Sequence, residues 1–162
     1  MRWMRGLGLF VAGTFLGIFM MQPTASPQKM APGIRLNHVG LFVKDLDESV
    51  NFYKRMGFSQ AFTFTDAQGH PVVYLQINRD TFMELTPATA EHPAGLSHIG
   101  VWSDDLNSTV TELRQKGIKV DDVSLGVTKA RITNLYDPNG VRTELLQFPP
   151  ESLQRKAIDS WK

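Results

Sequence analysis

Cysteine is absent from this chain of 162 residues, and that absence excludes several kinds of site and scaffold. There can be no disulfide framework, no thiolate zinc site and no cysteine nucleophile. The chain also lacks a strong charge of either sign. Its formal net charge is +1, so no basic field indicates nucleic-acid binding. The composition is 42% hydrophobic, 20% charged and 10% aromatic, which is typical of a globular domain.

The net charge hides an uneven distribution along the chain. Residues 1–33 hold three basic side chains and no acid, so of the 17 basic residues 14 remain in the rest of the chain, against 16 acids. A basic start, an uncharged and mostly apolar run at residues 6–21 and a polar, proline-rich exit are the three parts of a secretory signal. That run also approaches the roughly 20 residues that span a bilayer. We expect residues 1–33 to be a signal peptide or membrane anchor plus linker. The domain would then be exported, periplasmic or extracellular, either released or held at the membrane by residues 6–21.

An internal repeat organises the remainder of the chain. At an offset of 60 residues, residues 36–41 (LNHVGL) align with residues 96–101 (LSHIGV). The alignment continues without a gap to Glu84-Leu85 and Glu144-Leu145. Matches that keep residue type and order over roughly fifty positions predict two copies of one module, at residues 34–87 and 95–148.

Each module is expected to fold as βαβββ. Asp45 and Asp105 are candidate helix N-caps, and Gly57 suits the end of the first helix. A module of about 55 residues buries little core alone, so we expect the two sheets to pack or pair with each other. A short helix is expected within the C-terminal tail, residues 149–162. The predicted strands are the alternating or apolar runs bounded by turns, at 35–43, 59–65, 72–76, 81–86, 129–136 and 142–147, with a less regular one near 120–125.

Two histidines and two glutamates occupy equivalent positions in the two modules. His38 and His98 lie on the first strands, and Glu84 and Glu144 lie on the last ones; each His-to-Glu separation, 84 − 38 and 144 − 98, is 46 residues. If the faces of the two sheets oppose each other, the four side chains converge. Two neutral imidazoles and two carboxylates balance a divalent cation, and mixed nitrogen and oxygen ligation suits Ni, Co, Zn, Fe or Mn. We therefore predict one divalent metal ion of open identity, held by these four residues.

Other side chains share the ligand-bearing face and are candidates for contact with a small-molecule substrate. Arg142 is a candidate clamp for a carboxylate. Strand alternation places three aromatic residues on the same face as possible cavity wall: Phe42, Phe82 and Trp102. The sequence leaves open which way three further aromatic residues face: Phe62, Phe64 and Tyr74.

Two segments carry a resemblance to the vicinal oxygen chelate superfamily, which includes glyoxalase I, methylmalonyl-CoA epimerase, fosfomycin-resistance proteins, extradiol dioxygenases and bleomycin-resistance proteins. Residues 36–46 (LNHVGLFVKDL), continuing through 51–53 (NFY), resemble its opening signature. Residues 136–145 (YDPNGVRTEL) resemble its closing one. The resemblance covers about residues 34–148. It implies an α+β fold in which two βαβββ modules pack into a glyoxalase-like, partly closed barrel after the apolar leader.

The resemblance also implies a function. His38, Glu84, His98 and Glu144 match the His and Glu ligand sets of glyoxalase I and the epimerases. We expect a metal-dependent, glyoxalase I-like lyase or isomerase (lactoylglutathione lyase-like) acting on a small carbonyl substrate. The metal would chelate vicinal oxygens, and Glu144 or Glu84 would transfer the proton. The export leader and the lack of recognisable glutathione-reading residues after Glu84 disfavour the glutathione hemithioacetal as substrate.

Two alternatives stay open at this point. One is a non-catalytic small-molecule-binding or resistance protein of the bleomycin-resistance type. The other is a fosfomycin-type transferase, whose resemblance leaves Glu84 unexplained. The oligomeric state is open as well, since in this superfamily one chain can close its own site or two chains can exchange modules in a homodimer.

Overall fold

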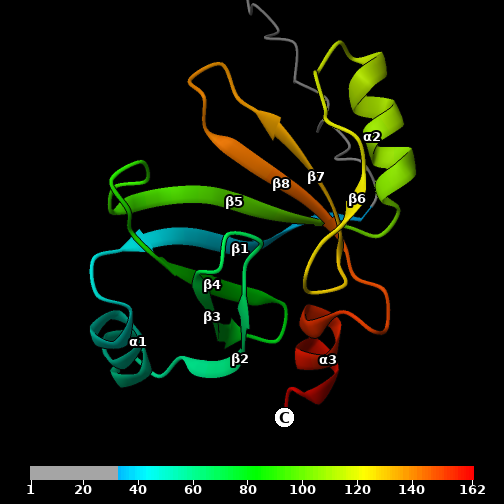
Figure 1. Ribbon diagram of the computed structural model, residues 1–162. Helices are drawn as coiled ribbons and strands as arrows, with labels where there is room; N and C mark the ends of the chain where they lie inside the picture. Colours follow the sequence, from blue (N-terminus) through cyan, green and yellow to red (C-terminus); the bar gives the residue numbers. More distant parts are fainter. Residues whose placement is uncertain (1–32) are drawn as a thin grey trace, which may run out of the picture.

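The computed structural model describes residues 33–162, so the predicted leader lies outside the described residues except for Gly33. Within the described part, no helix is long and apolar enough to cross a membrane. Figure 1 shows the arrangement of the elements. In chain order they are β1 (Ile34–Val43), α1 (Leu46–Arg55), β2 (Ser59–Thr65), β3 (Pro71–Asn78), β4 (Thr81–Pro87), β5 (Gly95–Ser103), α2 (Leu106–Gln115), β6 (Ser124–Leu125), β7 (Arg131–Tyr136), β8 (Arg142–Gln147) and α3 (Leu153–Ser160).

The strands form one mixed sheet with the order β2-β3-β4-β1-β5-β8-β7-β6. Each half has the same connectivity, because its first and last strands run parallel, β1 with β4 and β5 with β8. The halves join where β1 pairs antiparallel with β5, across the middle of Figure 1. The α+β prediction is therefore confirmed, with the two sheets paired edge to edge.

The sheet remains open, which corrects the expected partly closed barrel. Closure would require the edge strands β2 and β6 to pair, and β6 has only two residues. The expected strand near 120–125 is shortened to this pair, while Val120 makes only an isolated bridge with Leu135. A strand as short as β6 offers too few backbone groups to close the sheet.

The sequence signals at the helix ends have the predicted roles. Asp45 caps α1 by accepting a hydrogen bond from the Glu48 backbone N–H at 2.8 Å, and Asp105 caps α2 in the same way. Gly57 follows α1 with φ +98°, a conformation that favours glycine. Helix α3 lies within the predicted tail, with Ser152 as its N-cap.

The three helices divide the apolar core between the two faces of the sheet. Helix α1 packs on β3 and β4 through a cluster around Val50 and Leu75, and α2 packs near β8 through Leu106 and Val110. Helix α3 instead packs on a third cluster that includes Tyr74. Because Tyr74 and Leu75 are neighbours on one strand, they face opposite sides, so α3 covers the face opposite to α1.

Two glycines make the junction of β1 and β5 possible. In the register of these strands, His38 lies opposite Gly100 and Gly40 lies opposite His98. A Cβ atom on Gly100 would overlap the His38 ring, and one on Gly40 would overlap the His98 ring. Each imidazole therefore crosses the neighbouring strand through space that only glycine leaves free.

We predict that Gly40→Ala and Gly100→Ala each lower the free energy of unfolding by about 1–3 kcal/mol, because the added methyl group must displace a buried ring. Denaturant unfolding measures the change. Gly126→Ala is the matched control, since a Cβ there meets nothing nearer than the Ala130 carbonyl oxygen at 3.4 Å. Wild-type stability in both variants would contradict the packing described for the two histidines.

Candidate metal centre

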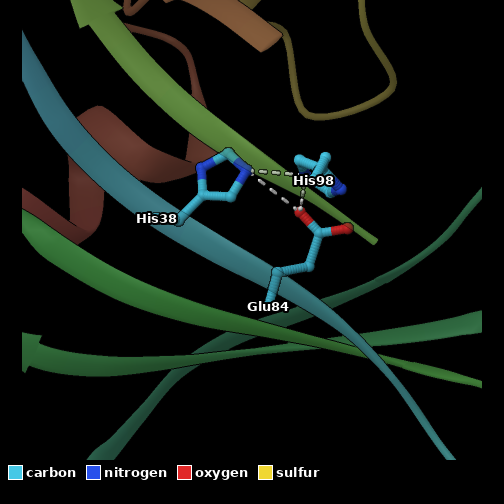
Figure 2. A group of neighbouring side chains, drawn as sticks. All are labelled: His38, Glu84 and His98. Atoms are coloured by element: carbon cyan, nitrogen blue, oxygen red, sulfur yellow. Dashed lines mark hydrogen bonds and ion pairs between the residues drawn. The ribbon is translucent and has the colours of Figure 1, made fainter. Parts of the chain in front are cut away.

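The four predicted ligands converge from the four central strands of the sheet. The Nε2 atoms of His38 and His98 are 2.8 Å apart. Glu84 Oε2 is 3.5 Å from each of them, and Glu144 Oε2 is 3.7 Å from His38 Nε2 and 3.4 Å from His98 Nε2. Figure 2 shows His38, Glu84 and His98 pointing toward one another. Their ligand atoms all lie within 4.8 Å of one another.

These separations fit a single cation. Two ligand atoms that each lie about 2.1 Å from one ion are themselves about 3.0–3.4 Å apart. Imidazole nitrogens together with carboxylate oxygens form a donor set that first-row divalent metals accept. The geometry therefore provides a site that can hold a divalent metal.

The strand register explains why the four side chains meet. Glu84 lies opposite Gly40 on the neighbouring strand, and Glu144 lies opposite Gly100. Because His98 covers Gly40, the histidine of one half lies beside the glutamate of the other. The glycines thus bring ligands together from residues that are far apart in the chain.

Asn37 sets the orientation of the His38 ring. Its Nδ2 group donates to the Asp80 carbonyl oxygen at 2.8 Å, which leaves its Oδ1 atom as an acceptor. His38 Nδ1 lies 3.1 Å from that Oδ1, so Nδ1 carries the hydrogen and Nε2 keeps a free lone pair. A metal-binding histidine needs this arrangement.

His98 has two partners at Nδ1, Ser97 Oγ at 2.9 Å and Arg142 Nη2 at 2.8 Å. Since a guanidinium can only donate, the arginine contact places the imidazole hydrogen on Nε2, toward His38. A cation at Nε2 requires that hydrogen to lie on Nδ1 instead, where the Ser97 hydroxyl can accept it. Arg142 Nη1 also contacts Glu144 Oε1 at 2.9 Å.

Burial and neighbouring charges shift the pKa values of the site in different directions. Burial lowers the pKa of His38 to about 4, so this imidazole is neutral at pH 7. Burial alone would raise the pKa of Glu84, but hydrogen bonds and the two nearby histidines outweigh it and lower the pKa to about 2. Burial raises the pKa of Glu144, and it raises the pKa of Tyr74 well above its ordinary value. Glu84 therefore remains ionised, whereas Glu144 binds a proton more readily.

A cavity of about 1180 Å³ opens onto the site, and Glu84 and Glu144 belong to its wall. The predicted contact residues Arg142 and Phe42 also line it, with the Phe42 ring stacked on His92 at 5.0 Å between centroids. A cavity of this size accommodates a small-molecule ligand.

Phe82 and Trp102 share the predicted face but are not among the cavity-lining residues. Both are buried in the cluster beneath α3, where Trp102 packs against Phe148. Strand alternation predicts the face on which a side chain lies but not which part of that face another element covers. Here α3 and the Phe148 segment cover the end of the sheet that carries these two rings.

Sequence reasoning missed several supporting residues. The sequence does not predict which way Phe62, Phe64 and Tyr74 point. Phe64 and Tyr74 line the cavity, and the Phe62 ring stacks on the Tyr74 ring. Asn37 and Ser97 were not singled out, although they are equivalent at the offset of 60 and both contact a histidine Nδ1. The repeat was a signal that could have identified this pair.

We predict that Asn37→Ala weakens Co²⁺ binding about 10- to 100-fold, because His38 loses the partner that holds its ring and hydrogen in place. Titration of the full chain with Co²⁺, followed by visible absorbance, measures the affinity. The matched control is Asn51→Ala, at an exposed position of α1. An Asn37→Ala variant that binds Co²⁺ as tightly as the wild type would show that the asparagine is dispensable.

The chain is similar to members of one known superfamily. The model of the Glyoxalase/Bleomycin resistance protein/Dioxygenase superfamily matches residues 35–145. The mitochondrial methylmalonyl-CoA epimerase of Homo sapiens is 30% identical, with 70% of this chain and 73% of that protein covered.

Solved structures of epimerases are similar as well. A variant of the Streptomyces coelicolor methylmalonyl-CoA epimerase in complex with 2-nitronate-propionyl-CoA has 29% identity and a TM-score of 0.61, covering 70% of this chain and 93% of that one. A methylmalonyl-CoA epimerase in complex with methylmalonyl-CoA and NH4+ has 28% identity and a TM-score of 0.63, covering 73% and 96%. The chain belongs to the Glyoxalase/Bleomycin resistance protein/Dioxygenase superfamily, the vicinal oxygen chelate superfamily that its two signatures resemble.

Proposed function

We propose that this chain is a metal-dependent isomerase of the epimerase type, which moves a proton at the carbon beside a carbonyl group of a small acid or its thioester. The observation that carries the proposal is the convergence of two buried imidazoles with two carboxylates that line one cavity. The similarity to epimerases supports the isomerase over the glyoxalase I-like lyase, although both chemistries begin with removal of such a proton.

The four ligands fit a divalent cation, which would stabilise as a Lewis acid the negative charge that develops on a carbonyl oxygen. His38, His98, Glu84 and Glu144 would hold it. The neutral state of His38 and the ionised state of Glu84 suit this role, because metal ligands must be free of protons.

One of the carboxylates would also carry the proton. Glu144 lies at the cavity wall, and burial raises the pKa of its carboxyl group, which makes it a better proton acceptor than Glu84. Glu84, whose pKa is lowered to about 2, would stay ionised as a ligand of the metal.

Arg142 brings a positively charged side chain to the cavity wall. The guanidinium lines the cavity and contacts Glu144 Oε1, where it can also bind a substrate carboxylate beside the reacting carbon. In a methylmalonyl thioester, the carboxylate and the thioester carbonyl are attached to the same carbon, the one that loses the proton. We therefore propose a 2-substituted malonyl group as the substrate class.

Export by residues 1–33 would separate the domain from cytoplasmic CoA, so the thiol that carries the malonyl group need not be CoA. The proton-exchange assay below therefore compares methylmalonyl-CoA with a short methylmalonyl thioester. Cell fractionation of the full chain tests the localisation itself.

We predict that the full chain loaded with a divalent metal exchanges the α-proton of one of these thioesters with D₂O, as followed by proton NMR, and that EDTA abolishes the exchange. Glu144→Gln should slow the exchange about 10²- to 10⁴-fold, the usual contribution of a general base. Glu112→Gln, at an exposed position of α2, is the matched control.

Metal content, measured by elemental analysis on the same samples, separates loss of the base from loss of the metal. A chain that binds no divalent metal would exclude the metal-dependent enzyme. The non-catalytic binding protein would then be the better interpretation. A loaded chain that exchanges no proton in either thioester would exclude the proposed substrate class.

A further inference from the structure

Tyr74, in the middle of β3, is tied directly to the candidate metal centre. It lies opposite Glu84 in the register of β3 and β4, and its hydroxyl donates to Glu84 Oε2 at 2.5 Å. The same oxygen lies 3.5 Å from the Nε2 atoms of both His38 and His98. One carboxylate oxygen therefore contacts the tyrosine and both imidazoles.

The ring of Tyr74 is held so that the hydroxyl keeps this direction. The side chain is only 2% exposed. Its ring stacks on Phe62 with centroids 4.6 Å apart, and it meets the edge of the His38 ring at 5.4 Å. These ring contacts do not involve the hydroxyl, so removing that one oxygen leaves the packing intact.

Helix α3 packs against the cluster of side chains that contains Tyr74. This helix lies beyond residues 35–145, which the superfamily model matches, and packs on the cluster that contains Tyr74 through Ala157 and Ile158. It also brings Gln154 to the wall of the same cavity. Tyr74 lines that wall as well.

Stability does not explain the choice of glutamine at this position. Gln154 is 2% exposed, and its Oε1 atom is buried without a hydrogen-bond partner among residues 33–162. A buried carbonyl that lacks a partner destabilises the folded state, and an apolar side chain of similar size would avoid that cost. The glutamine therefore points to a role at the site.

We propose that Tyr74 is a positioning residue of the metal centre, and that α3 supports it through Gln154. The proposal rests on the metal-dependent function proposed above. By donating to Glu84 Oε2, Tyr74 keeps this carboxylate in one orientation as a fixed ligand. Glu144, which contacts Arg142 instead, is left as the carboxylate that accepts the proton.

The first test is Tyr74→Phe in the full chain, titrated with Co²⁺. We expect the affinity to fall about 10- to 100-fold, as for other residues that orient a metal ligand. The visible spectrum of bound Co²⁺ should also change, which a purely structural role would not produce. Tyr53→Phe is the matched control, because it removes the same oxygen from a tyrosine of α1 that packs on Phe58 in a different cluster.

Two further variants test the route of the effect. In a Glu84→Gln background, Tyr74→Phe should cause no additional loss of affinity, because the hydroxyl acts through that carboxylate. Gln154→Leu should weaken Co²⁺ binding less than Tyr74→Phe does, while its thermal midpoint without metal stays unchanged or rises. A lower midpoint with unchanged affinity would assign Gln154 to packing and overturn the part played by α3.

The wild-type titration separates failure of this inference from failure of the proposed function. A wild-type chain that takes up no Co²⁺ or other divalent metal would overturn the metal centre, and with it the role of Tyr74. A wild type that binds Co²⁺ while Tyr74→Phe matches its affinity and spectrum would overturn the role of Tyr74 alone. An equal loss in the Glu84→Gln background would likewise overturn it.

Discussion

The antiparallel pairing of β1 with β5 is the constraint on which the rest of the structure depends. It joins the two halves of the sheet and aligns His38 with Gly100 and His98 with Gly40. Each ring then crosses the neighbouring strand and reaches the glutamate of the other half. A shift of one residue in this register would place the two histidines on opposite faces of the sheet. The site and the junction of the halves are therefore one structural feature.

Burial of four ionisable groups at this junction is costly unless each has partners. His38 avoids the cost by staying neutral beside Asn37, and the Tyr74 hydroxyl donates a hydrogen bond to Glu84. Glu144 has the Arg142 guanidinium on one oxygen, while its other oxygen faces the histidines. Such an assembly is poorly explained as a stabilising core, because apolar residues of the same size would fill the space at lower cost. A divalent cation would balance the two carboxylates.

The scaffold separates its supporting parts from the part that can vary. Helices α1 and α2 pack on the face opposite the site and complete the apolar layers of the two halves. The site face carries the cavity and α3, which lies outside the residues matched by the superfamily model. Because superfamily members share one scaffold, differences in substrate must come from such additions and from the cavity wall. Gln154 and Arg142 are two of the polar residues on that wall.

The sequence by itself determined the α+β class, nearly all the strands, the helix caps and the four side chains that meet, because strand alternation and the offset of 60 residues are properties of the chain. Only the tertiary structure decided that the sheet stays open, since the two residues of β6 cannot close it. It also decided that Phe82 and Trp102 lie under α3 and that Tyr74 bonds to Glu84. These outcomes depend on which segment covers each part of a face and on how strands separated in sequence align, and local residue patterns do not encode either.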